Sequence, residues 1–151
     1  MSYQPKDADP GVIPTLGALA LGLAGICHAA LALQFLGMWV LGPVTWLFVV
    51  VMLVLGVAAT AVAWQLGQAR TWAAVAGALL APVLGIMSTS FTAYALYHAS
   101  FAFYMLLAPP AAGLAFALVP FAVVPCRRAA KAQAELRQRY TSGPFAGVLD
   151  R

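Results

Sequence analysis

The sequence contains very little charge, and its longest uncharged stretch is its most informative feature. Only 8% of the 151 residues are charged, and residues 71–126 contain no Asp, Glu, Lys or Arg. A helix crosses the roughly 30 Å hydrocarbon core of a bilayer with about 20 apolar residues. The stretch is too long for one crossing and has the length of two. We therefore interpret it as a transmembrane hairpin whose turn lies near residues 95–100, among aromatic side chains of the kind found at a membrane–water interface.

The shortage of charge also excludes a soluble globular fold, in which about 25% of residues are charged. Hydrophobic residues make up 64% of this chain. The net charge of +4 does not indicate nucleic-acid binding, because five of the eight Lys and Arg residues lie between Arg127 and Arg139, directly after the last hydrophobic stretch. This group, the basic cluster, is typical of a segment that adjoins a membrane.

Cysteine is scarce as well, and the two that are present are badly placed for a disulfide. Cys27 lies inside the first hydrophobic segment, and Cys126 lies at the edge of the last. A rise of about 1.5 Å per residue separates their depths by about 20 Å, whereas a disulfide needs Cα atoms within about 7 Å. We predict no intrachain bridge.

The hydrophobic segments predict an all-α, polytopic membrane protein with four transmembrane helices. The expected helices cover residues 13–36, 44–64, 72–94 and 101–124. Residues 1–12 form a polar tail, 13–125 the membrane domain, and 126–151 a basic segment and tail. The first hydrophobic segment does not fit a signal peptide, because it exceeds the about 15 residues of an h-region and lacks a basic flank.

Prolines complicate the last two helices. Pro82 predicts a kink in the third helix, while Pro109, Pro110 and Pro120 predict a fourth helix that is bent or locally unwound. An alternative extends the third helix to Leu107 and starts the fourth after the Pro-Pro pair. It requires one helix of about 54 Å and another of about 22 Å. We therefore favour the turn near 95–100.

The basic residues predict the orientation. With four crossings, Lys6, Arg70 and the basic cluster fall on one side of the membrane, whereas the loops at 37–43 and 97–100 contain no Lys or Arg. By the positive-inside rule both termini are cytoplasmic, and a bacterial cytoplasmic (inner) membrane is the expected location. Residues 127–140 are expected to form a short amphipathic helix on the cytoplasmic side.

Small residues recur at helical spacing on two predicted helices. On the third helix they lie at a strict spacing of four, and on the first they form a second small face. The two sets comprise Ala73, Gly77, Ala81 and Gly85, and Ala18, Gly22, Gly25 and Ala29. Small residues let helix backbones approach closely in lipid, where hydrophobic burial does not drive association. They either pack the helices of one monomer or join the chain to a second copy or a larger complex.

His28 is the only histidine well inside a predicted helix. Ionisable side chains inside a membrane are often functional. The structural interpretation is a neutral imidazole that is hydrogen-bonded to a carbonyl or to a hydroxyl at similar depth. The residues expected at that depth are Thr45, Ser88, Ser90, Thr92 and Tyr104.

The functional alternative for His28 is haem ligation together with His98. The two histidines differ in depth by about 12 Å, although axial ligands of one haem should be nearly level. Two histidines without a carboxylate in the membrane are also too few for a closed metal site. We therefore expect no cofactor and no metal, with His28 and His98 as weak haem candidates.

The start of the basic cluster has two interpretations. Arg127, Arg128 and Lys131 either anchor the topology or contact anionic lipid or an acidic partner. The predicted membrane helices contain no carboxylate, which ion-coupled transport normally requires. We expect a non-catalytic subunit or scaffold that packs with itself or with a larger membrane protein complex. An oligomeric channel or transporter for a small solute or ion, and a haem-binding redox subunit, stay open as alternatives.

The orientation can be tested with single cysteines introduced for labelling by a membrane-impermeant reagent. Because the basic loops alternate across four crossings, Gln68 and Gln138 should be labelled from the cytoplasm, and Gly42 and Ser100 from the opposite side. Labelling of Ser100 from the cytoplasm would show that the hairpin assignment is wrong.

Overall fold

The computed structural model describes residues 11–36, 43–97 and 103–142, and this part of the chain is built from four long helices. They are α1 (Val12–Leu36), α2 (Pro43–Gly67), α3 (Thr71–Tyr97) and α4 (Phe103–Ser142). Each is long and apolar enough to cross a membrane. For α1 to α3 both ends lie within three residues of the predicted ones. The four apolar helices indicate an integral membrane protein.

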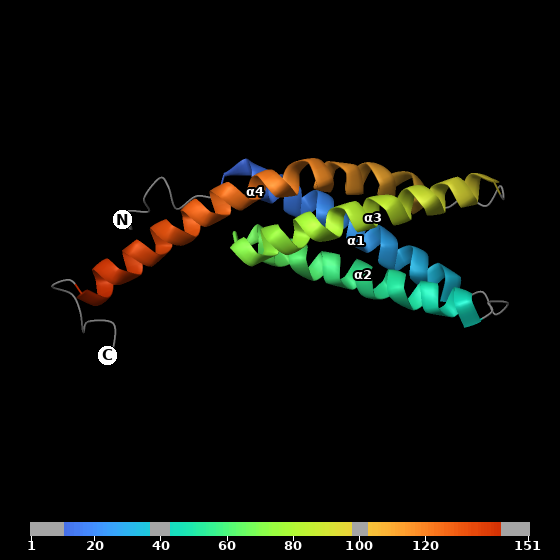
Figure 1. Ribbon diagram of the computed structural model, residues 1–151, viewed down its shortest axis with the longest axis horizontal. Coiled ribbons are helices and arrows are strands. Elements are labelled where there is room, and N and C mark those ends of the chain that lie inside the picture. The colour runs from blue at the N-terminus through green and yellow to red at the C-terminus, as the bar shows by residue number, and fades with distance from the viewer. Residues whose placement is uncertain (1–10, 37–42, 98–102, 143–151) are drawn as a thin grey trace.

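Consecutive helices run in opposite directions, as Figure 1 shows. The start of α1, the α2–α3 turn and the last part of α4 lie toward one end, which we call the basic end because Arg70 and Arg127 are there. α1 packs along both α2 and α4, and α4 packs along α3. The contact between α2 and α3 is less extensive, and α1 touches α3 least. The bundle is therefore organised around α1 and α4.

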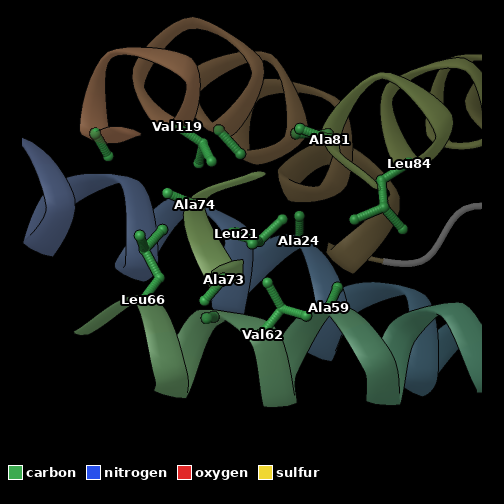
Figure 2. Close-up of a cluster of buried hydrophobic side chains, with 14 of the residues drawn as sticks. Leu21, Ala24, Ala59, Val62, Leu66, Ala73, Ala74, Ala81, Leu84 and Val119 are labelled. Atoms are coloured by element: carbon green, nitrogen blue, oxygen red, sulfur yellow. The ribbon is translucent and has the colours of Figure 1, made fainter. Parts of the chain in front are cut away.

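The main core is rich in alanine. Of the sixteen buried residues in its largest cluster, ten are alanine, and the largest side chains are those of Leu21, Leu66 and Leu84. Figure 2 shows these side chains converging from all four helices. Since alanine is short, the helix axes can lie close together and the backbones contribute directly to the packing.

α1 and α2 approach each other closely at Gly25 and Gly56. A Cβ atom built on Gly56 would lie 2.7 Å from the amide nitrogen of Ala29 and 2.7 Å from the carbonyl oxygen of Gly25. A Cβ on Gly25 would lie 2.7 Å from the carbonyl oxygen of Gly56 and from the Thr60 hydroxyl oxygen. Side chains larger than hydrogen do not fit at either position.

The turn between α2 and α3 is a tight helix cap. Ala69 has a left-handed backbone, with φ of 57°. Its N–H donates to the carbonyl of Leu66 at 2.8 Å, and the N–H of Arg70 donates to the carbonyl of Gln65 at 3.1 Å. This is the Schellman pattern, which satisfies the last carbonyls of a helix. The carbonyl of Arg70 then accepts from the N–H of Ala73 at 3.1 Å, so α3 starts without a loop.

α4 differs from the expectation. The predicted fourth helix ended at 124 and was followed by a separate short helix, whereas the structure has one helix of 40 residues, Phe103–Ser142. At about 1.5 Å per residue this is about 60 Å, twice the hydrocarbon thickness. Its four prolines do not interrupt it. Proline is tolerated where neighbouring helices surround it, and the Ala, Lys, Arg, Gln, Glu and Leu residues after Cys126 are strong helix formers.

The glycine contact between α1 and α2 predicts a strong position dependence of glycine-to-alanine substitutions. Gly56→Ala should separate the two backbones and lower the free energy of unfolding by about 1–3 kcal/mol, as overpacking does. Thermal unfolding of the detergent-purified protein, followed by circular dichroism, would measure this.

Gly113→Ala is the matched control, because a Cβ there would have no neighbouring heavy atom within 4 Å. It should be neutral or stabilise α4 by up to about 1 kcal/mol through helix propensity. Equal destabilisation by both substitutions would contradict the close contact.

Candidate functional site

The most distinctive polar feature inside the bundle is His28, which is fully buried between α1 and α3. Its Nδ1–H donates to the carbonyl of Ala24, one turn earlier on α1, at 2.7 Å. Its Nε2 lies 3.4 Å from the hydroxyl oxygen of Ser88 on α3, which is also buried. The Ser88 hydroxyl reaches the carbonyl of Leu84 as well. His28 therefore links two helices that otherwise touch little.

The hydrogen-bonding partners of His28 and Ser88 determine which of their atoms carry a proton. A carbonyl only accepts, so Nδ1 of His28 carries a hydrogen, and in a neutral imidazole Nε2 is then an acceptor. Ser88 has a single hydroxyl proton and two acceptors within reach, Nε2 of His28 and the carbonyl of Leu84. The neutral pair is satisfied by sharing that proton, and every partner belongs to the chain itself.

Other members of the expected polar layer have different positions. Thr92 donates its hydroxyl to the carbonyl of Met105 at 3.0 Å, which ties α3 to α4 near the hairpin turn. Ser90 is exposed on α3. The side chains of Thr45 and Tyr104, and all of His98, lie outside the described residues. Among the described residues of this expected polar layer, Ser88 is the one that lies next to His28.

The small residues Ala73, Gly77, Ala81 and Gly85, which we call the α3 stripe, face the inside of the bundle along most of their length. Ala73, Gly77 and Ala81 are buried. A Cβ built on Gly77 would lie 3.0 Å from Val119 of α4, 3.1 Å from Leu21 of α1 and 3.6 Å from Val62 of α2, so all four helices meet here. Gly85 is different, because it is half-buried and a Cβ there would have no neighbouring heavy atom within 4 Å.

The small face of α1 lies against α2. Gly22 packs against Ala63, whose Cβ would lie 3.5 Å from a Cβ at Gly22, and Gly25 lies at the close approach to Gly56 described above. Sequence reasoning missed the α2 half of this contact. The available signal was the spacing of small residues on α2, at Gly56, Thr60, Ala63 and Gly67.

The basic residues that follow Cys126 lie on the part of α4 that continues past the bundle (Figure 1). Arg127, Arg128 and Lys131 are exposed, whereas Ala129 is buried. Ala132 and Leu136 are half-buried and continue the same side as Ala129. Arg127, Arg128 and Lys131 therefore lie on an exposed side of this segment, away from the buried Ala129.

The described residues offer packing surfaces and an internal polar pair, His28 and Ser88. Among residues 11–36, 43–97 and 103–142, no three His, Cys, Asp or Glu side chains come close enough together to hold a metal ion. Cys27 and Cys126 are free and buried. Comparison with protein-family models, curated proteins and solved structures finds no match to this chain. The class defined by the fold is a four-helix integral membrane protein.

The His28–Ser88 contact can be measured by a double-mutant cycle in detergent. His28→Gln should fold and lose about 1 kcal/mol of unfolding free energy, and Ser88→Ala should lose a similar amount. The coupling energy between the two substitutions should be about 0.6 kcal/mol, the average for hydrogen bonds between membrane helices.

Ser90→Ala is the matched control, because it removes an exposed hydroxyl two residues away, and it should show no coupling to His28→Gln. Zero coupling for Ser88→Ala would refute the contact. A His28→Gln variant of full stability that loses its native particle size would assign the imidazole a role beyond packing.

Proposed function

We propose that the chain is a small, non-catalytic integral membrane subunit or scaffold that associates with a second copy or with a larger membrane protein complex. In this proposal both termini are cytoplasmic and the location is a bacterial cytoplasmic membrane, as the distribution of basic residues favours. The observation that carries the proposal is the part of α4 that extends beyond the bundle.

This extension is a continuous helix and not a flexible tail. It follows directly from the membrane-embedded half of α4, within the single helix Phe103–Ser142. A side chain on it is therefore held at a fixed direction relative to the bundle. A rigid helix that carries exposed charges outside the membrane is suited to docking, because little conformational entropy is lost when a partner binds.

The outward side of the extension is basic. Arg128 and Lys131 are exposed and share a shallow surface hollow with Glu135. A partner with an acidic surface would gain specificity and association rate from these two positive charges. Arg127 is exposed next to them and adds a third.

Within the membrane, the surface around Gly85 supports the same proposal. The buried members of the α3 stripe are used inside the monomer, whereas Gly85 has open space where a side chain would be. A helix of another chain could approach the α3 backbone here as closely as α2 approaches α1 at Gly56.

The proposal predicts the mass of the detergent-solubilised particle. The wild-type chain should form a complex of defined stoichiometry, measured by light scattering with the detergent contribution subtracted. Arg128→Glu with Lys131→Glu should reduce it to a single chain, since the reversed charges repel an acidic partner. The unfolding temperature should not change, because exposed substitutions usually alter stability by less than about 0.5 kcal/mol.

The matched control is Arg128→Lys with Lys131→Arg, which keeps both charges and should keep the wild-type mass. A wild-type protein that is a single chain in mild detergent, and also after cross-linking in its native membrane, would refute the proposal.

A further inference from the structure

A hollow of about 470 Å³ lies at the basic end, between the α2–α3 turn and the extension of α4. On one side it is lined by Gln68, Arg70 and Trp72, and on the other by Gln133 and Arg137. The two arginines are far apart in the sequence and come from different elements. The fold therefore brings two arginines, which no local motif contains, to the lining of one hollow.

Both walls of the hollow are held in place by the fold. On the turn side, the N–H of Arg70 is bonded to Gln65, and its carbonyl accepts from Ala73 and Ala74. On the other side, Gln133 and Arg137 lie one turn apart on the uninterrupted helix α4. Because the backbones on both sides are fixed, the hollow exists before any ligand enters it.

The chemistry of the lining favours an anion. Arg70 and Arg137 are positively charged, the amides of Gln68 and Gln133 can donate hydrogen bonds, and none of the residues that line the hollow is acidic. The hollow beside Arg128 and Lys131 differs, because Glu135 also lines it. Guanidinium groups bind carboxylate and phosphate oxygens in bidentate fashion, and one phosphate group can accept hydrogen bonds from both arginines.

The position of the hollow favours a lipid phosphate over a soluble one. The apolar span of α2 ends at Gly67 and that of α3 begins at Thr71, so the turn lies where the hydrocarbon ends. Trp72, which lines the hollow, is 56% exposed, and Trp64 on α2 is 71% exposed. Exposed tryptophan at the ends of membrane helices is typical of the level of the lipid headgroups.

We propose that this hollow is a binding site for the headgroup of an anionic phospholipid, whose phosphate contacts Arg70 and Arg137. The site is separate from the outward basic side of α4 and does not rest on the proposed scaffold function. A lipid bound here connects the α2–α3 turn to the extension of α4.

The test is lipid binding to the full chain in detergent micelles, followed by native mass spectrometry and by the shift in unfolding temperature. Phosphatidylglycerol should bind as one retained lipid and raise the unfolding temperature. Phosphatidylcholine, whose headgroup carries no net charge, and inorganic phosphate should do neither. If inorganic phosphate stabilises the protein as much as phosphatidylglycerol does, the lipid assignment is wrong.

Two variants locate the site. Arg70→Gln with Arg137→Gln should weaken phosphatidylglycerol binding about thirtyfold, which corresponds to about 1 kcal/mol for each basic residue near an anionic lipid. Arg128→Gln with Lys131→Gln removes the same charge from outside the hollow and should change the affinity less than about twofold if the contact is local. Equal weakening by both pairs would refute the site in favour of general attraction to a basic surface.

A third variant separates shape from charge and remains informative if the arginine variants fold poorly. Ala134 lines the hollow and is exposed on α4, so Ala134→Trp should fill the space while leaving every charge in place. It should abolish retention of the lipid with an unchanged helical spectrum. Retention at the wild-type level would show that the hollow is not the binding site.

Discussion

The bundle depends on how closely its helix backbones can approach one another. In a bilayer the lipid tails are as apolar as the side chains, so helices associate through van der Waals contact and hydrogen bonds. The Gly25–Gly56 contact places α1 and α2 within backbone distance, and Gly77 gives Val119, Leu21 and the α2 side chains a common meeting point. The alanine-rich core follows from the same constraint, because larger side chains would hold the helices apart. A side chain at Gly25 or Gly56 would push α1 and α2 apart, and one at Gly77 would meet side chains of α1, α2 and α4, whereas a Cβ at Gly113 would have no neighbouring heavy atom within 4 Å.

Close packing determines how near the helices lie, and the few interhelical polar and aromatic contacts determine how they are aligned along their axes. α1 and α3 share little surface, yet His28 reaches across to Ser88. Thr92 bonds the backbone of α4, and the rings of Phe48 and Phe91 stack between α2 and α3 with centroids 5.3 Å apart. Such contacts act only at one axial position, because a hydrogen-bonding group that slides past its partner in lipid is left unsatisfied. The buried imidazole thus has a structural role that apolar packing cannot supply.

Composition and periodicity predicted the four membrane helices, and the ends of α1 to α3 were close, because uncharged segments of about 20 residues have few other solutions in a membrane. The pairing of helices was not predictable in the same way. A small face at Gly22 and Gly25 shows that something packs closely there, but it does not identify Gly56 as the partner, and the stripe ending at Gly85 combines buried positions with an open one. The end of α4 was missed because the predicted fourth helix ended with the last hydrophobic stretch, and the basic segment after it was assigned to a separate helix. Local sequence rules do not take into account that neighbouring helices allow α4 to continue through its prolines, or that strong helix formers follow Cys126.

The length of α4 gives the molecule a property that a separate short helix would not have. Since the membrane-embedded half and the extension are one helix, Val119 in the core and the residues beyond Cys126 belong to the same uninterrupted element. With 3.6 residues per turn, Arg137 and Gln133 lie on one face of the extension and Arg128 and Lys131 on a largely opposite one. The first face borders the α2–α3 turn, and the second borders a different hollow. Two ligands could therefore be bound at once without competing. A headgroup held between the turn and α4 would add a second connection between the extension and the bundle, and a partner on the outer face would meet a helix that is already oriented.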